Sequence, residues 1–296
     1  MTEKTIEVRE DEDFDHTAAE RYMREHIEGL PEGELEVRQF PSGASNLTYL
    51  VKIGGWEGVL RRPPLGPVPP KAHDMERESG LLMKLHEAYP LAPKPYFFTD
   101  DESIIGAPFY VMEHRQGVIV DDEFPKDVDP TEELCRGMSQ MVADTLIELH
   151  AVDWKEAGLE ELGRPEGFLE RQVNGWIKRY EEAKTEEIGE VEPLTEWICE
   201  AIPESPPATI VHNDFKLNNL VLNPDDLTEV RAVIDWEMTT IGDPLFDLAV
   251  SLSYWVEEGD SQELKEVLPT VTDAPGFWTR KAFVDYYAEK SGRDLS

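Results

Sequence analysis

The chain has 296 residues, 40% of them hydrophobic, which is long enough for a globular protein with a sizeable core and two lobes. It contains neither the ~18 uninterrupted apolar residues of a membrane span nor a secretory signal at its acidic N-terminus, so we expect a cytoplasmic protein with no membrane contact. Its 63 Asp and Glu against 28 Lys and Arg give a formal net charge of −35, and such a surface repels nucleic acid and anionic lipid.

The first third of the chain predicts a short helix followed by three antiparallel strands. Residues 16–29 have a helical pattern that ends at Gly29. Residues 34–40, 46–53 and 56–62 each alternate polar and apolar side chains in the manner of a strand. The links between these strands, PSGAS and GG, are turn sequences, so neighbouring strands should pair with each other.

A stiff link and a second helix come next. Five prolines between positions 63 and 70 remove the N–H donors that a helix or a sheet requires. Residues 73–89 have helical spacing, and residues 107–117 read as a buried strand followed by a connection. From about residue 130 onwards helical patterns dominate. We therefore predict two lobes that meet near residues 114–121, the first comprising residues 1–114 and the second residues 115–296.

Polar side chains with clear chemistry interrupt the apolar runs between residues 208 and 237. The runs ATIVH, LVLN and VRAVID predict three strands, and NPDDLTE between the last two is turn material. If those two strands pair as a hairpin whose turn is centred near residues 226–227, Asn219 lies opposite Asp235. Asp214 lies in the loop that enters the same end of the hairpin. The sequence therefore predicts three oxygen-bearing side chains in one place.

This combination suits a magnesium site beside a general base. A carboxylate and an amide oxygen are hard ligands that Mg²⁺ accepts while it keeps waters and recruits phosphate oxygens. A second carboxylate, free of the metal, can orient a hydroxyl group and take its proton. Taken alone, Asp214 and Asn219 are equally consistent with ordinary loop capping, because Asp and Asn are common in turns. Their coupling to Asp235 favours the chemical interpretation.

Three linked motifs, HNDFKLNN, IDWE and IGDPLFDLA, resemble those of aminoglycoside phosphotransferase-like (choline kinase-like) enzymes in order and spacing. The likeness runs from about residue 36 to 293, and segments such as SNLTYLV, VLRRPPLG and HDMERE are similar to the branch related to the kinase-like domain fused to some acyl-CoA dehydrogenases. The resemblance implies an α+β, protein-kinase-like two-lobe fold, with a small antiparallel β lobe and a larger, mainly helical lobe. It also implies ATP or GTP with Mg²⁺ as cofactors and a small-molecule substrate with a hydroxyl group.

The resemblance assigns roles to individual residues. It makes Asp214 the catalytic base or hydroxyl-orienting group, Asn219 a magnesium ligand and Asp235 the principal magnesium ligand. The nucleotide would be held by a turn over its phosphates, by a cation paired with a helix glutamate, and by a hinge against the adenine; these residues are Ser42, Gly43, Ser45, Asn46, Arg61, Glu76, Met112, Glu113 and His114. Supporting positions behind the site are His212, Lys216, Glu237, Asp243 and Asp247.

Some of these positions depart from the family pattern or have a structural explanation. Arg61 stands where the family usually has lysine, and a guanidinium can still hold phosphate, although its reach and geometry differ. If Glu76 does not pair with Arg61, it is simply one charge on a solvated helix face. Asp243 before Pro244 is a good helix N-cap, and Asp247 would brace the catalytic loop from that helix.

The acceptor and two rival functions stay open at this point. The branch suggests a hydroxy acid or a hydroxyacyl-CoA as acceptor. The chain stops at SGRDLS, where relatives continue into further helices; this early end and Arg61 favour the first rival, a nucleotide-binding pseudokinase that acts as a regulator. The second rival is a metal-dependent hydrolase built on His212 and Asp214. It requires further ligands that the sequence does not cluster, and His212 is better explained as a hydrogen-bonding residue that braces the loop.

The acidic residues decorate helices that also carry apolar stripes, and they do not form one acidic tail. We interpret this pattern as a folded protein whose surface stays hydrated in concentrated salt, where screening over a few ångströms removes the self-repulsion. The sequence therefore indicates a halophilic source, with an acidic mesophilic protein as the alternative.

Overall fold

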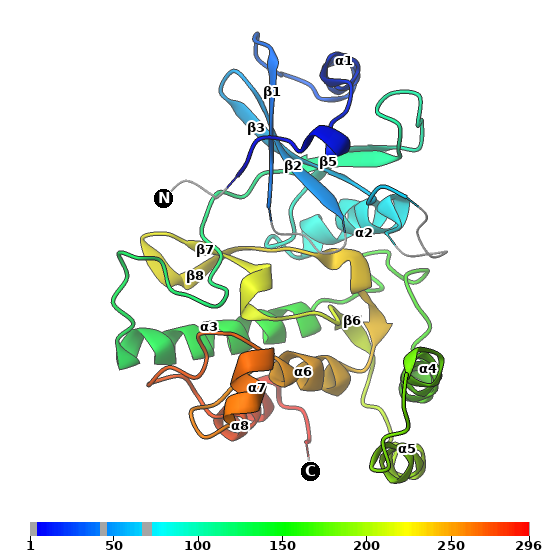
Figure 1. Ribbon diagram of the computed structural model, residues 1–296, viewed down its shortest axis with the longest axis vertical. Helices are drawn as coiled ribbons and strands as arrows, with labels where there is room; N and C mark the ends of the chain where they lie inside the picture. Colours follow the sequence, from blue (N-terminus) through cyan, green and yellow to red (C-terminus); the bar gives the residue numbers. More distant parts are fainter. Residues whose placement is uncertain (1–4, 42–45, 67–72, 296) are drawn as a thin grey trace.

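The computed structural model describes residues 5–41, 46–66 and 73–295 and has two parts, one above the other in Figure 1. The upper part is built on a five-stranded antiparallel sheet with the strand order β1–β2–β3–β5–β4. Helices α1 (His16–His26) and α2 (Met75–Ala88) belong to the same part. The strands are β1 (Leu35–Gln39), β2 (Leu47–Ile53), β3 (Trp56–Arg62), β4 (Pro95–Thr99) and β5 (Phe109–Glu113).

The two faces of this sheet contact different cores. Alternate side chains of a strand point to opposite faces, so one face can pack on α1 and the other on α2. Tyr49 of β2 is buried in a cluster with Ala19 of α1. Val59 of β3 and Met112 of β5 join a second cluster that includes Leu82 of α2 and extends into the lower part of the molecule. The sheet is therefore attached to the lower part through one face and α2.

The GG link between β2 and β3 forms the expected tight hairpin. Ile53 pairs with Trp56, so Gly54 and Gly55 are the only two loop residues. The φ angle of Gly54 is +55°, a left-handed conformation that two-residue hairpin turns require and that glycine adopts without a Cβ clash. A Cβ at Gly54 would lie 2.9 Å from the carbonyl oxygen of Glu32. This link therefore fixes the register of the two central strands.

The lower part is mainly helical and carries two small antiparallel sheets, β6–β9 and β7–β8 (Figure 1). Together with the upper sheet, this confirms the predicted α+β class. The helices of the lower part are α3 (Glu132–His150), α4 (Phe168–Ala183), α5 (Val191–Glu200), α6 (Pro244–Ser253), α7 (Gln262–Val267) and α8 (Arg280–Ser291). Its strands are β6 (Thr209–Val211), β7 (Leu220–Asn223), β8 (Asp226–Val233) and β9 (Thr240–Gly242).

Most predicted elements are present with small changes at their ends. The third predicted strand, 56–62, has the same bounds as β3, and the helix predicted over 73–89 becomes α2. The first helix ends at His26, three residues before the predicted stop at Gly29, because the backbone of Ile27 is extended; the N–H of Ile27 donates the last helical bond, to the carbonyl of Met23. Across the described ranges, none of the helices combines the length and apolar character that crossing a membrane requires.

Candidate active site

The hairpin β7–β8 carries two of the predicted site residues, with a register that differs from the prediction. Leu220 pairs with Val233, and the N–H of Ile234 bonds to the carbonyl of Asn219 at 2.9 Å. Asn219 therefore faces Ile234, and the predicted pairing with Asp235 was wrong by one residue. The turn lies about two residues nearer the N-terminus than predicted, since Asn223 pairs with Asp226, and two register shifts in the ladder compensate for all but one residue of this displacement.

A backbone feature compensates for this one-residue difference. Shifting a strand by one position turns each side chain to the opposite face, which would separate Asp235 from Asn219. Asp235 follows β8 with a φ angle of +66°, in the left-handed region that Asp tolerates better than most residues. Both side chains line the same cavity. The left-handed conformation of Asp235 therefore brings its side chain to the same cavity as that of Asn219, which was the expected result of the predicted pairing.

The cavity has a volume of about 430 Å³ and lies between the upper sheet and the β7–β8 hairpin. It brings together Asp214, Asn219 and Asp235. The other predicted residues that line it are Asn46, Arg61, Met112, Glu113, His114, Lys216 and Glu237. Glu76 is exposed on α2, and His212, Asp243 and Asp247 lie behind the cavity wall. The predicted phosphate-covering residues Ser42, Gly43 and Ser45 lie outside the described residues.

Asp214 is held by neighbours on both sides. The amide nitrogen of Asn219 donates to the carbonyl oxygen of Asp214 at 2.8 Å and to its carboxylate at 2.9 Å. The ammonium group of Lys216 lies 3.1 Å from the same carboxylate oxygen. Lys216 also lies over the ring of Tyr254, at 4.7 Å from its centroid. Burial, followed by the charge of Asp214, raises the pKa of Tyr254, so this phenol stays protonated near neutral pH.

A buried carboxylate on α6 holds the loop that precedes Asp214. Asp247 accepts hydrogen bonds from the backbone N–H groups of His212 and Asn213, each at 2.7 Å. Asn213 has a φ angle of +63°, a conformation that these bonds hold in place. His150 at the end of α3 contacts Asp247 at 3.1 Å, and its second ring nitrogen lies 2.6 Å from the hydroxyl of Tyr287. The loop is therefore anchored to three helices.

His212 and Asp243 also hold backbone segments next to the site in place. The ring of His212 is buried, and burial lowers its pKa, so the imidazole is neutral at pH 7. Its Nε2 lies 3.1 Å from the carbonyl oxygen of Ile234, directly before Asp235, and this links the two site loops. Asp243 accepts from the N–H of Leu245 at 2.7 Å as the N-cap of α6. Both contacts orient backbone segments.

Arg61 makes two ion pairs, and the first of them corrects a prediction. Its guanidinium contacts Glu78, whose side chain is 1% exposed, and not Glu76. Its second nitrogen lies 3.2 Å from the carboxylate of Asp235. Burial raises the pKa of Glu78, while Arg61 opposes that shift. The sequence carried a signal for Glu78: positions 75, 78, 79 and 82 form one buried helix face at the spacing i, i+3, i+4, i+7, and position 76 is not on it.

The Glu78→Gln variant should unfold more easily than the parent protein. Removing this carboxylate leaves the partly exposed Asp235 as the one carboxylate paired with the buried Arg61 among the described residues, and breaking a buried pair costs about 3 kcal/mol or more of unfolding free energy. The matched Glu76→Gln variant removes an exposed charge from the same helix and should stay within about 0.5 kcal/mol of the parent. Urea unfolding followed by circular dichroism measures both values. Equal losses in the two variants would contradict the assigned pairing.

Side chains of the upper part hold the segment that follows Asp235. The amide of Asn46 donates to Glu237 at 2.7 Å, and its oxygen lies 3.0 Å from a ring nitrogen of His73. The guanidinium of Arg77 on α2 donates to the backbone carbonyl oxygens of Glu237 and Thr239. These bonds set the separation of Asp235 from the sheet.

The predicted hinge comprises the last two residues of β5, Met112 and Glu113, and the next residue, His114. The N–H of Glu113 bonds to the carbonyl of Lys94 at 2.8 Å, so this donor is used within the sheet. His114 contacts Glu57 at 2.9 Å. Lys52, with help from Gln116 and His114, lowers the pKa of Glu57 to about 2. The hinge is thus fixed to β3 through Glu57.

Comparison with known proteins identifies the family of this chain. The sequence model of the family described as the phosphotransferase enzyme family matches residues 36–274. Acyl-CoA dehydrogenase family member 11 of Mus musculus is 38% identical over 261 residues, covering 86% of this chain and 33% of that protein. The chain spans about a third of the length of the curated relatives it matches.

Solved structures share the fold. An aminoglycoside phosphotransferase-like protein from Ralstonia eutropha has a TM-score of 0.77 and 29% identity, covering 96% of this chain and 82% of that chain. The streptomycin–ATP–APH(2")-IIa ternary complex has a TM-score of 0.58 and 20% identity, covering 95% of this chain and 84% of that chain. The implied protein-kinase-like fold is therefore confirmed.

Proposed function

Because the chain belongs to the phosphotransferase enzyme family, we propose that it transfers the γ-phosphate of ATP or GTP to a hydroxyl group of a small molecule. The observation that carries the proposal is the single cavity lined by Asp214, Asn219 and Asp235 together with Arg61. Phosphoryl transfer requires little covalent chemistry from the protein, so positioning and charge neutralisation supply most of the rate. These four side chains, two carboxylates, an amide and a guanidinium, fit this requirement.

The donor set at one end of the cavity fits magnesium. Asp235 offers a carboxylate that is 32% exposed, and Asn219 offers an amide oxygen, since its nitrogen is directed to Asp214. Oxygen ligands of this kind, completed by water and phosphate, suit Mg²⁺. We assign Asn219 and Asp235 to hold the ion, which would neutralise charge on the phosphates. Arg61, placed 3.2 Å from Asp235, would face the same phosphates.

Asp214 is the group we assign to the acceptor. Its carboxylate would accept a hydrogen bond from the acceptor hydroxyl, align that oxygen with the γ-phosphorus and receive its proton as the bond to phosphorus forms. Asn219 and Lys216 hold the carboxylate in place. Asn46, Met112, Glu113 and His114 line the opposite wall, where we place the nucleotide. In this assignment the residues 1–114 contribute the nucleotide wall and the residues 115–296 contribute the acceptor side.

The relatives suggest which hydroxyl compounds to test. Their names identify acyl-CoA dehydrogenases, so a hydroxy acid or a hydroxyacyl-CoA is the acceptor class we propose first. The solved relative that holds streptomycin and ATP shows what that protein binds, and it supports nucleotide use by this fold. Aminoglycosides therefore belong in the test panel, although the acceptor need not be a drug.

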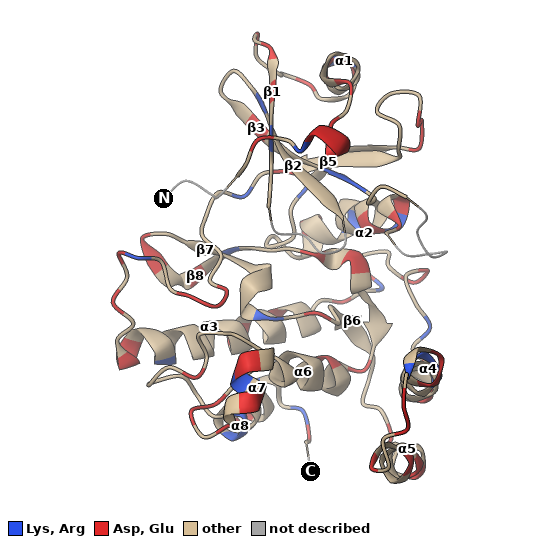
Figure 2. Ribbon diagram, in the orientation of Figure 1, with Lys and Arg blue, Asp and Glu red and all other residues tan. Residues whose placement is uncertain are grey.

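The acidic surface favours a protein that works in the cytoplasm of a salt-accumulating cell. Asp and Glu lie on both parts of the molecule and gather in no single site (Figure 2). With a formal net charge of −35, self-repulsion is screened only when the Debye length shrinks to ~3 Å, as in molar salt. The same charge disfavours nucleic acid as a partner.

A nucleotide-consumption screen in molar potassium chloride tests the proposed function. Hydroxy acids, their CoA esters, amino alcohols, sugars and aminoglycosides are each offered with ATP or with GTP. We expect at least one hydroxyl compound to stimulate phosphate transfer, and a chelator in excess of Mg²⁺ to abolish the transfer. Magnesium-dependent nucleotide binding without turnover on any acceptor would favour the pseudokinase instead. Retention of one tightly bound transition metal after dialysis would favour the hydrolase.

A further inference from the structure

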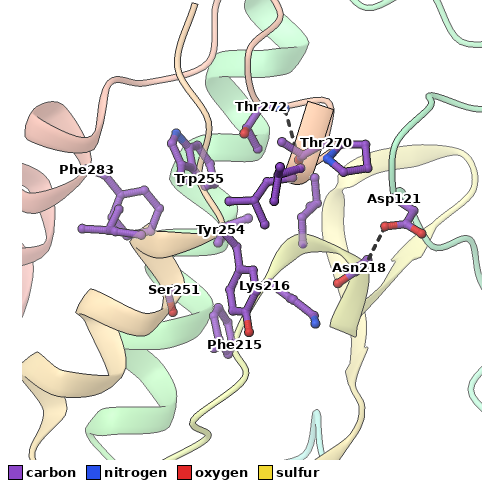
Figure 3. Close-up of a pocket in the computed structure, with 16 residues that line it drawn as sticks. Asp121, Phe215, Lys216, Asn218, Ser251, Tyr254, Trp255, Thr270, Thr272 and Phe283 are labelled. Atoms are coloured by element: carbon purple, nitrogen blue, oxygen red, sulfur yellow. Dashed lines mark hydrogen bonds between the residues drawn. The ribbon is translucent and has the colours of Figure 1, made fainter. Parts of the chain in front are cut away.

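A second, smaller cavity of about 190 Å³ is lined by Lys216 and Tyr254, among other residues (Figure 3). It shares Asp121, Lys216 and Asn218 with the larger cavity, so the two are neighbours. Tyr254 lines the smaller cavity and also interacts with Asp214. A molecule that fills the smaller cavity therefore presents one end to Lys216 and Asp214, where the proposed acceptor hydroxyl must lie.

The inner wall of this cavity is apolar. Phe215 and Phe283 are fully buried, and Val142 and Trp255 are nearly so. Phe215 lies in the loop after β6 that also contains Asp214, Phe283 in α8, Val142 in α3 and Trp255 just after α6. The wall is therefore rigidly supported. The indole nitrogen of Trp255 donates to the carbonyl oxygen of Trp278 at 2.8 Å and is satisfied within the protein. In front of this wall the apolar side chains of Leu252, Leu268 and Pro269 are at least partly exposed and face a ligand.

The few polar groups at this cavity are unsuited to a cationic molecule. Lys216 is its one cation, and Asp121, which already accepts from Asn218 at 2.8 Å, is its one carboxylate among the residues described. Asp121 is exposed and lies where the two cavities join, so an ammonium group placed against the apolar inner wall would lose hydration without meeting a carboxylate. Ser251 is 6% exposed, and its hydroxyl has no hydrogen-bond partner among the described residues, so it is available to a neutral or anionic ligand.

We propose that the smaller cavity binds an uncharged alkyl or aryl substituent of the acceptor and sets its length. A cavity of about 150 Å³ holds a benzene molecule, so about 190 Å³ accommodates a substituent of roughly six to eight carbon atoms. The acceptor is then a neutral or anionic hydroxyl compound with an apolar portion, despite the strongly acidic surface of the chain. The role of the cavity in acceptor selection rests on the proposed function. Binding of an apolar molecule to the cavity does not depend on that function.

Calorimetric binding of straight-chain primary alcohols, from butanol to decanol, tests the cavity without nucleotide. We expect the affinity to rise about fourfold with each methylene until the chain reaches six to eight carbons, and then to level off. The cation 6-aminohexan-1-ol should bind at least about tenfold more weakly than 1-hexanol, because its ammonium group stays unpaired. Equal or tighter binding of the amino alcohol, or affinity independent of chain length, would overturn the proposal.

Variants at Thr270 identify the site of binding. Thr270 lines the smaller cavity from the segment after α7 and is only partly buried, so Thr270→Phe fills the space without altering the core. It should reduce 1-hexanol affinity at least about tenfold while the thermal unfolding midpoint is kept, and Thr270→Ser should bind as the parent does. Unchanged binding in Thr270→Phe would overturn the assignment to this cavity. Should that variant unfold, the comparison of 1-hexanol with the amino alcohol still decides.

The two proposals can fail separately. If the alcohols bind with the expected length dependence and no hydroxyl compound is phosphorylated, the proposed function is wrong and the cavity assignment stands. If hydroxyl compounds are phosphorylated with no dependence on the length of their apolar portion, the cavity assignment is wrong and the function stands.

Discussion

The Asp235→Ala variant is expected to lose about 10²–10³-fold of its nucleotide consumption, the range that removing one preorganised electrostatic group commonly costs. Asp235 offers the carboxylate that lines the cavity beside Asn219, and it is also the second partner of Arg61. Its loss removes the proposed anchor for Mg²⁺ and frees one end of the guanidinium. The rate is measured by nucleotide consumption over a Mg²⁺ titration, in which the variant should show no saturation in the range where the parent does.

Two further variants separate the charge from the backbone. Asp235 has a left-handed conformation that Asn tolerates and Ala does not, so Asp235→Asn removes the charge with less strain. We expect Asp235→Ala and Asp235→Asn both to lose activity. Only Asp235→Ala should unfold more easily than the parent, by about 1 kcal/mol. Asp225→Ala, in the exposed turn of the same hairpin, is the matched control and should keep the parent rate. Parental activity in Asp235→Asn would remove this residue from the metal site.

The sequence predicted the composition of the site better than its detailed geometry. Alternation and turn residues were sufficient for β3 and for the GG hairpin, because both depend on local patterns. The register of β7–β8 could not be predicted, since it depends on shifts that local periodicity does not encode. The left-handed conformation of Asp235 also had no sequence signal beyond the tolerance of Asp for it.

Long-range contacts account for the other differences. Glu78 could have been recognised from the buried face of α2, whereas the choice of Glu76 followed family position alone. The smaller cavity could not be found in the sequence, because its wall combines residues from α3, the catalytic loop, α6 and α8. Likewise, the contact of His150 with Asp247 joins residues 97 positions apart. Packing between distant segments decides such contacts.

The Asp214→Ala variant should lose about 10²–10⁴-fold of kcat for phosphate transfer, the range that a general base contributes, with little change in nucleotide affinity. Its carboxylate lines the larger cavity and contacts Lys216, which both cavities share, so we expect its loss to affect the acceptor more than the nucleotide. Nucleotide affinity is measured by calorimetry, and kcat by turnover with the best acceptor of the screen. A loss of nucleotide affinity equal to the loss of kcat would assign Asp214 to the nucleotide side instead.

The Asp214→Asn variant distinguishes proton acceptance from orientation. An amide keeps a hydrogen-bond acceptor for the hydroxyl group and has nearly the same shape, but it cannot receive the proton. If Asp214 mainly orients the hydroxyl, the asparagine variant should keep clearly more activity than the alanine variant. If it takes the proton, the two variants should be equally slow. Lys216 pairs with this carboxylate, and the effects of neighbouring groups in one network are not additive. The Lys216→Met substitution should therefore reduce activity less in the Asp214→Asn background than in the parent protein.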